Sequence, residues 1–160
     1  MSKVELYEEY TREEVNNIFN ADVPFTLGAG IYGMHGLIRV KKENSDPDFI
    51  FFGTLGQDKL GYEFAEEISK DGELNWQSQP KQALDNERII QLINHNEDEN
   101  NIYLFIRHGK SAKEYVYLGN LAYVSHDTTK EKPVHFVWKI IQWSQDSIDK
   151  LREIGIEVVN

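Results

Sequence analysis

Short apolar segments, rich in aromatic and β-branched residues, recur along this 160-residue chain and constrain its fold more than any other feature. Runs of this length and composition predict β-strands. At least six strands are expected from the segments at residues 37–41, 49–55, 73–78, 101–108, 113–118, 121–126 and 134–143. Their spacing argues against a parallel βαβ arrangement and favours a sheet built from neighbouring strands.

Helix signals lie mainly outside these segments. Thr11 and Glu14 fit a capping box that opens a helix over residues 12–20. Apolar residues at helical spacing predict a second helix from Leu84 to His95, and a third is expected over residues 146–154, ended by Gly155. We therefore predict one α+β domain over residues 1–160: a β-dominated curled sheet or open barrel at residues 37–143, with two to three peripheral helices.

Composition limits the functions open to the chain. With no cysteine, disulfides, thiolate metal sites and a cysteine nucleophile are excluded. The 27 acidic residues against 17 basic ones give a formal net charge of −10, which counts against broad, non-specific nucleic-acid binding. A local basic patch, or a surface that imitates a polyanion, remains open. No signal peptide or apolar run of ~20 residues stands out, so we expect a cytoplasmic protein with no membrane partner.

Catalytic and metal-binding patterns do not stand out. The glycine-rich stretch at residues 27–36 lacks a phosphate-loop ending, and close backbone packing explains it better. The five histidines show no metal spacing, His126-Asp127 reads as a turn, and Ser78 does not lie in a nucleophile elbow. We predict no catalytic residue, no metal and no cofactor.

The segment Trp76-Gln77-Ser78-Gln79 is the strongest candidate for ligand binding. It places one flat aromatic ring beside three hydrogen-bonding side chains, a combination suited to a planar polar ligand. Trp76 either packs in the core or stacks on a ligand. Because strand residues alternate between faces, at least one of the three polar side chains faces inward and needs a partner, from the protein or from a ligand.

Basic residues near the strand ends form the second candidate. Arg107, His108 and Lys110 close a strongly apolar strand; they are either a solvent-exposed strand end or a phosphate clamp. On an acidic body, DNA binding must come from a few cations. We therefore expect Arg39, Arg107 and Lys110 to form one patch, with a shallow dependence of log affinity on log salt of about −2 to −3.

The ordered set of these segments resembles the domain found C-terminal to the helicase core in many bacterial DEAD/DEAH-type helicases, often behind a phospholipase-D-like nuclease. The resemblance covers nearly all of residues 10–143; Asn75 stands where that family often has His, and the chain carries no helicase or nuclease. In this chain the strand motif around Trp76 precedes two further strand segments, Leu104-Phe105-Ile106-Arg107 and Tyr117-Leu118-Gly119. This order is similar to the layout of modified-base reader domains with a PUA-like barrel. The resemblance implies a DNA-processing or phage-defence setting, with a helicase or nuclease as partner.

Three functional hypotheses follow. The first is a non-enzymatic DNA-recognition module that reads a modified or flipped base. In it, Trp76 stacks on the base, and Gln77 and Gln79 read its edge, with Ser78 between them as a further binding residue. The cations Arg39, Arg107, His108 and Lys110 hold phosphates. The second is an acidic protein-interaction module that binds a nucleic-acid enzyme as a decoy. The third is a small nuclease, which no set of metal-binding carboxylates supports.

Overall fold

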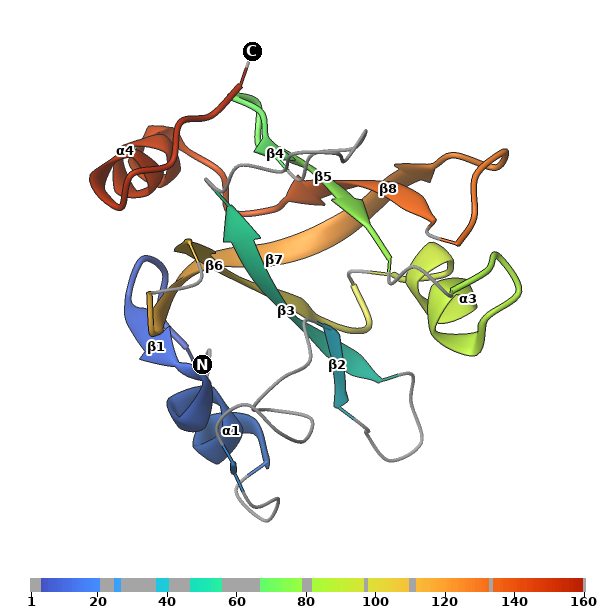
Figure 1. Ribbon diagram of the computed structural model, residues 1–160, viewed down its shortest axis with the longest axis horizontal. Helices are drawn as coiled ribbons and strands as arrows, with labels where there is room; N and C mark the ends of the chain where they lie inside the picture. Colours follow the sequence, from blue (N-terminus) through green and yellow to red (C-terminus); the bar gives the residue numbers. More distant parts are fainter. Residues whose placement is uncertain are drawn as a thin grey trace.

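The computed structural model describes residues 4–20, 25–26, 37–40, 47–55, 67–78, 82–96, 98–109, 112–132 and 134–159. Within these ranges, one mixed sheet of eight strands is surrounded by three helices, as Figure 1 shows. The elements in chain order are β1 (Glu9–Thr11), α1 (Arg12–Asn20), β2 (Leu37–Val40), β3 (Asp48–Leu55), β4 (Glu67–Ile68), β5 (Glu73–Gln77), α3 (Glu87–Ile93), β6 (Ile102–His108), β7 (Glu114–His126), β8 (His135–Ile140) and α4 (Gln145–Glu153). The α+β class predicted from the sequence is confirmed.

The strand order is β2-β3-β6-β7-β8-β5-β4, and β1 pairs with β7. All the pairings between these strands are antiparallel except that of β3 with β6. Between those two strands the chain passes through β4, β5 and α3, so the parallel pair does not come from a simple βαβ unit. The spacing of the strands in the sequence did not predict the parallel pair of β3 and β6. The two strands are far apart in the chain, and such a long-range pairing leaves no local sequence signal.

The sheet curls so that strands far apart in its order touch across the concave face. Phe51 of β3 and Trp76 of β5 are separated by three intervening strands, yet their rings meet edge to face with centroids 4.6 Å apart. The concave face carries the larger core, in which Phe51, Leu104 and Trp138 are at most 1% exposed. The predicted curled sheet is therefore confirmed, and its interior is filled by side chains.

The convex face of the sheet carries a second, smaller core. Val15 of α1 packs there with Ile50 and Phe105, all fully buried. Helices α3 and α4 both pack on the larger core, through Leu92 and Leu151, and Figure 1 shows them far apart, α4 toward β4 and α3 beyond the ends of β5 and β8. The two faces of each central strand are thus both buried, which explains why those strands read as continuous apolar runs.

Helix boundaries follow their local caps. The capping box is present: Glu14 N donates to Thr11 Oγ1 at 3.2 Å, and Thr11 N donates to Glu14 Oε1 at 3.0 Å. Helix α4 ends before Gly155, whose φ of +97° only glycine adopts readily. Helix α3 is shorter than the predicted span of 84–95, because Asn86 caps it by accepting from Arg88 N.

Other boundaries differ modestly from the predictions. The two strands expected at 113–118 and 121–126 are one strand, β7, whose pairing with β6 shifts register opposite Leu104 and Phe105. The last strand, β8, covers only the middle of the predicted 134–143 segment. The prediction for the glycine-rich stretch at 27–36 falls outside the described residues. Residues 62–69 suggest a helical turn or an irregular segment, but their described part contains the short strand β4.

Candidate nucleic-acid interface

Strand β5 divides the predicted ligand-binding segment between two faces. Leu74 and Trp76 lie on the concave core, so alternation places Asn75 and Gln77 on the other face. Trp76 and Gln77 therefore cannot contact the same side of one ligand. Gln79, the remaining polar residue of the segment, lies outside the described residues.

Trp76 is half-buried at the rim of the concave core. Its ring packs edge to face on Phe51 at 4.6 Å and tilted against Phe136 at 5.6 Å. Aromatic pairs in these orientations contribute about 0.5–1.5 kcal/mol beyond the area they bury. Part of the ring thus belongs to the core, and the half-buried remainder is the part that a ligand could reach.

Ser78 is the inward-facing polar residue, and its partner is the protein. It is 4% exposed, its N–H donates to Val134 O at 2.8 Å, and its Oγ accepts from Val134 N at 2.8 Å. The hydroxyl continues the β5–β8 pairing where the backbone ladder stops. Ser78 therefore has a structural role: its backbone and hydroxyl hold the end of β5 to the start of β8.

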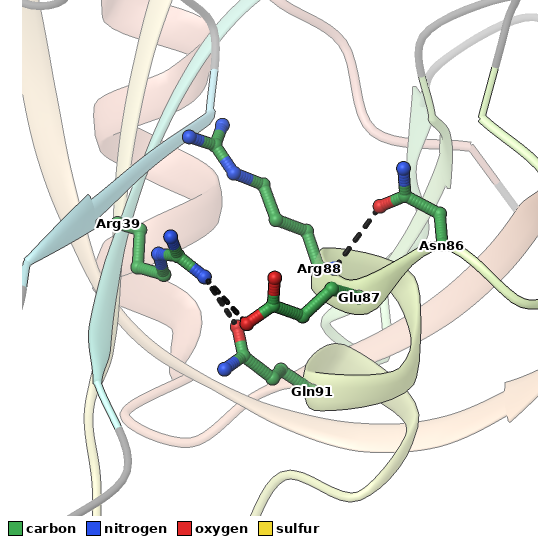
Figure 2. Close-up of polar contacts among 5 residues, drawn as sticks. All are labelled: Arg39, Asn86, Glu87, Arg88 and Gln91. Atoms are coloured by element: carbon green, nitrogen blue, oxygen red, sulfur yellow. Dashed lines mark hydrogen bonds and ion pairs between the residues drawn. The ribbon is translucent and has the colours of Figure 1, made fainter.

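Arg39 lies on the concave face at the edge strand β2, held against helix α3 (Figure 2). Its Nη1 lies 3.4 Å from Glu87 Oε1 and donates to Gln91 Oε1 at 3.3 Å. Its side chain is 22% exposed, whereas that of Glu87 is 77% exposed. An ion pair with so exposed a carboxylate is weak, so Arg39 can exchange it for a phosphate at little cost.

A pocket adjoins Arg39 between α3 and the start of β3; we call it the α3 pocket. It has a volume of about 170 Å³ and is lined by Pro47, Phe49, Ile90, Gln91, Asn94, His95 and Asn100. A cavity of roughly 150 Å³ holds a benzene molecule, so the α3 pocket has room for one six-membered ring. The amides of Gln91 and Asn94 carry donors and acceptors suited to the edge of such a ring, whereas the Asn100 amide donates to Pro47 O at 3.3 Å.

Arg107 is fixed on the convex face by three contacts. Its Nε donates to Thr54 Oγ1 at 2.9 Å and its Nη1 to Ala112 O at 2.8 Å. Its guanidinium carbon stands 4.8 Å from the centre of the Tyr115 ring. Arg12 shares that ring at 5.4 Å and donates from Nε to the Tyr115 hydroxyl at 3.1 Å.

A second pocket lies at the turn between β6 and β7; we call it the hairpin pocket. It has a volume of about 240 Å³ and is lined by Glu9, Arg107, His108, Ala112, Lys113, Glu114, Val116 and Ile154. Two of the predicted phosphate ligands, Arg107 and His108, line this hollow together with Lys113. Strand alternation turns their side chains toward opposite faces of the sheet, and the Arg107 guanidinium packs on Tyr115. Lys110, predicted to join them, lies outside the described residues.

The structure does not bring Arg39 and Arg107 into one patch, so this expectation is wrong for the described residues. Arg39 pairs with Phe49, whereas Arg107 pairs with Thr54, five positions further along β3. At ~3.3 Å per residue this separates them by roughly 17 Å along the strands. Arg39 lies on the concave face and Arg107 on the convex face, a consequence of strand alternation that composition does not reveal.

Sequence reasoning also missed several residues at these sites. Gln91 and His95 were read only as part of a helix, and Arg12 only as part of a capping box. Gln91 and His95 lie four residues apart in the predicted helix of residues 84–95, a spacing typical of one helical face, although α3 itself ends at Ile93. Nothing local in the sequence indicates which strand that face meets.

Three side chains near the β7–β8 turn, Tyr123, Asp127 and His135, have pKa values shifted from their ordinary ones. Burial raises the pKa of Tyr123, whose hydroxyl lies 2.5 Å from His126 Nδ1. Desolvation, followed by the positive charge of Lys130, lowers the pKa of His135 although Asp127 opposes it. Asp127 itself accepts from the backbone and hydroxyl of Thr129, which confirms the predicted turn.

Within the described ranges, no group of three or more His, Asp or Glu side chains could hold a metal ion. In the same part of the chain, no helix is long and apolar enough to cross a membrane.

Solved structures with this fold place the chain in a structural class. The SRA domain of SUVH5 in complex with hemi-methylated CG DNA matches with a TM-score of 0.57 and 16% identity, over 90% of this chain and 93% of that one. The DNA recognition domain of the cytosine modification-dependent restriction endonuclease LpnPI matches with a TM-score of 0.53 and 11% identity, over 86% of this chain and 73% of that one. Arabidopsis thaliana SUVH6 in complex with SAM matches with a TM-score of 0.51 and 15% identity, over 88% of this chain but 26% of that one. The fold is therefore similar to that of SRA (SET and RING-associated) modified-base readers, a PUA-like fold.

The family of the chain follows from its sequence. A family model described as Domain of unknown function (DUF3427) matches residues 4–148, and the chain belongs to that family. No curated protein matches the chain.

Proposed function

We propose that this protein is a non-enzymatic DNA-recognition module that reads a modified or flipped base. The observation that carries the proposal is the shared fold: about nine-tenths of the chain superposes on SUVH5 SRA domains whose structures contain methylated or hydroxymethylated DNA. At identities of 16% this likeness supports the fold alone, so the function has to be argued from the concave face.

The concave face offers the chemistry that such a reader needs. Arg39 supplies a cation that a weak ion pair holds ready for a phosphate. The α3 pocket beside it has room for one ring and carries amide groups for the ring's edge. Trp76 lies on the same face and has an aromatic surface that is only half-buried. We assign phosphate contact to Arg39, edge contacts to Gln91 and stacking to Trp76.

The test is a fluorescence-anisotropy titration with duplexes of one sequence carrying a central cytosine, 5-methylcytosine or 5-hydroxymethylcytosine. A specific base contact is worth about 1–3 kcal/mol of discrimination, so one modified duplex should bind at least about fivefold more tightly. Arg39→Ala should weaken binding to all three duplexes. Lys130→Ala, which removes an exposed cation from the turn between β7 and β8, is the charge-matched control. Equal, undetectable binding of all duplexes at low salt would end the proposal.

We also propose a biological setting. The resemblance to helicase-associated domains supports a helicase or nuclease partner, acting in the cytoplasm in DNA processing or phage defence. A reader module would direct such an enzyme to modified DNA.

A second function rests on a separate observation. Five glutamates are exposed along the N-terminal segment and α1: Glu5, Glu8, Glu9, Glu13 and Glu14. On a chain of net charge −10, this surface supports an acidic module that occupies the DNA-binding face of an enzyme. The prediction for that case is tight binding to a helicase or nuclease without binding to DNA, measured by the same titration with each enzyme added in turn.

A further inference from the structure

Arg39 and Gln91, to which the proposed function gives separate contacts with DNA, are bonded to each other in the free protein. Arg39 Nη1 donates to Gln91 Oε1 at 3.3 Å and lies 3.4 Å from Glu87 Oε1. Figure 2 shows both oxygens, four residues apart on α3, facing the same guanidinium nitrogen. The group that is proposed to hold a phosphate therefore also touches the group that is proposed to contact the base.

This bond fixes the direction in which the Gln91 amide faces. A guanidinium has five N–H donors and no acceptor, so the amide atom that meets Arg39 Nη1 is the oxygen. The amino group of Gln91, Nε2, is then turned away from Nη1, and no described residue accepts a hydrogen bond from it. Because Gln91 lines the α3 pocket, it has N–H donors left to offer a ligand there.

Arg39 has enough donors to keep this bond while it contacts DNA. Helix α3 uses only its Nη1, and within the part of the chain that the structure describes nothing accepts from its Nε or Nη2. These two nitrogens form one edge of the planar guanidinium, an edge that suits two phosphate oxygens. A phosphate on that edge repels Glu87, whose side chain is 77% exposed and whose ion pair is weak. It does not repel Gln91, which is uncharged.

A fixed amide distinguishes donors from acceptors better than a free one. The terminal torsion of a glutamine side chain is broad, and a free amide can present either its oxygen or its amino group. An amide that is held before the ligand arrives presents one of the two and loses less conformational entropy on binding. Lysine at position 39 would supply the charge, but it lacks the fork that reaches Gln91 and a phosphate together.

We propose that Arg39 is a positioning residue for Gln91: it holds the amide oxygen, so that the Gln91 amino group donates to an acceptor on the inserted base. That acceptor is a carbonyl oxygen or an unprotonated ring nitrogen, and the Watson–Crick edge of cytosine carries both kinds. The inference rests on the proposed function. It deepens that function by naming the atom of Gln91 that reads the base and the residue that orients it.

The experiment measures two quantities for each variant, using one duplex with a central 5-methylcytosine or cytosine. These are the ratio of the two dissociation constants and the slope of log affinity against log salt. Arg39→Lys keeps the charge, so the salt slope should be unchanged and the affinity for the cytosine duplex should stay within about twofold. Its preference for 5-methylcytosine should fall from at least about fivefold to about twofold or less. Gln91→Glu keeps an oxygen for Arg39 but has no amino group, and should lose the preference to the same extent.

Glu87→Gln is the matched control, because it changes the other acceptor on the same nitrogen. It removes a negative charge and should tighten the binding of both duplexes equally, so that the wild-type ratio is retained. Spectra of the ¹⁵N-labelled protein without DNA give a second readout. Arg39→Lys should shift the side-chain amide signals of Gln91, and Glu87→Gln should shift them much less.

The results separate two kinds of failure. Equal affinity of the wild type for both duplexes would refute base reading itself, and this inference with it. If the wild type discriminates, a preference that survives in Arg39→Lys or in Gln91→Glu would overturn the inference alone. A loss of preference in Glu87→Gln as large as that in Arg39→Lys would also overturn it, and so would Gln91 signals in the free protein that do not respond to Arg39→Lys.

Discussion

Replacing Trp76 by alanine tests whether its ring holds the two sides of the curled sheet together. The ring joins β5 to β3 through Phe51, two strands that share no hydrogen bonds. Removing a large buried aromatic side chain costs about 3–5 kcal/mol of unfolding free energy. Because Trp76 is only half-buried, we expect the lower end, about 3 kcal/mol.

This loss is large enough to measure in two ways. For a domain of this size, 1 kcal/mol shifts the melting temperature by about 2–4 °C, so Trp76→Ala should lower it by roughly 6–12 °C. Urea denaturation should show the same change in midpoint with an unchanged slope. Gln77→Ala is the matched control, since it alters the neighbouring residue on the opposite face; we expect a change within about 0.5 kcal/mol.

The outcome also separates packing from ligand contact. If Trp76 stacks on a base as well, the alanine variant should bind DNA about 1–3 kcal/mol more weakly under conditions where it remains folded. Trp76→Phe should restore most of the stability, because it preserves an aromatic contact with Phe51. A stability loss below about 1 kcal/mol for the alanine variant would refute the assigned packing.

Three further predictions concern other described residues. Ser78→Ala should cost about 1–3 kcal/mol in urea denaturation, because it leaves the buried Val134 N–H without its acceptor; a loss below 0.5 kcal/mol would contradict this role. Desolvation places the pKa of folded His135 below its unfolded value of 6.5, so its contribution to stability is complete above about pH 6.5 and declines as the pH falls toward the folded pKa. His135→Gln should therefore reduce the loss of melting temperature between pH 7 and 5, and an unchanged loss would count against the shift. Arg39→Ala should flatten the slope of log affinity for DNA against log salt by about 0.9, while Lys130→Ala leaves it unchanged; equal effects of the two variants would remove Arg39 from the interface.

Local signals in the sequence were sufficient to predict the first and last helices of the chain. Thr11 and Glu14 specify the start of α1, and Gly155 specifies the end of α4, because each acts on its own neighbours. The apolar segments likewise identified most of the strands. The two strands that were not predicted, β1 and β4, are three and two residues long, too short to give a recognisable pattern.

Long-range pairing could not be predicted from the same signals. The parallel pairing of β3 with β6 depends on contacts across the whole sheet. Register and alternation then decide that Trp76 and Gln77 face opposite sides, and that Arg39 and Arg107 do not meet. The sequence thus indicated which residues have side chains suited to binding. Which of them lie together in one site could be decided only from the topology of the sheet.

Discrimination between modified and unmodified DNA is the most direct test of a base-reading concave face. The measurement is the pair of dissociation constants for one duplex, with a central 5-methylcytosine and with cytosine, for the wild type and for Gln91→Ala at fixed salt. We predict that the wild type prefers the methylated duplex by at least about fivefold, and that Gln91→Ala loses most of this preference while its binding to the unmodified duplex changes little. Equal affinity of the wild type for both duplexes would contradict base reading by the concave face, and so would an undiminished preference in Gln91→Ala.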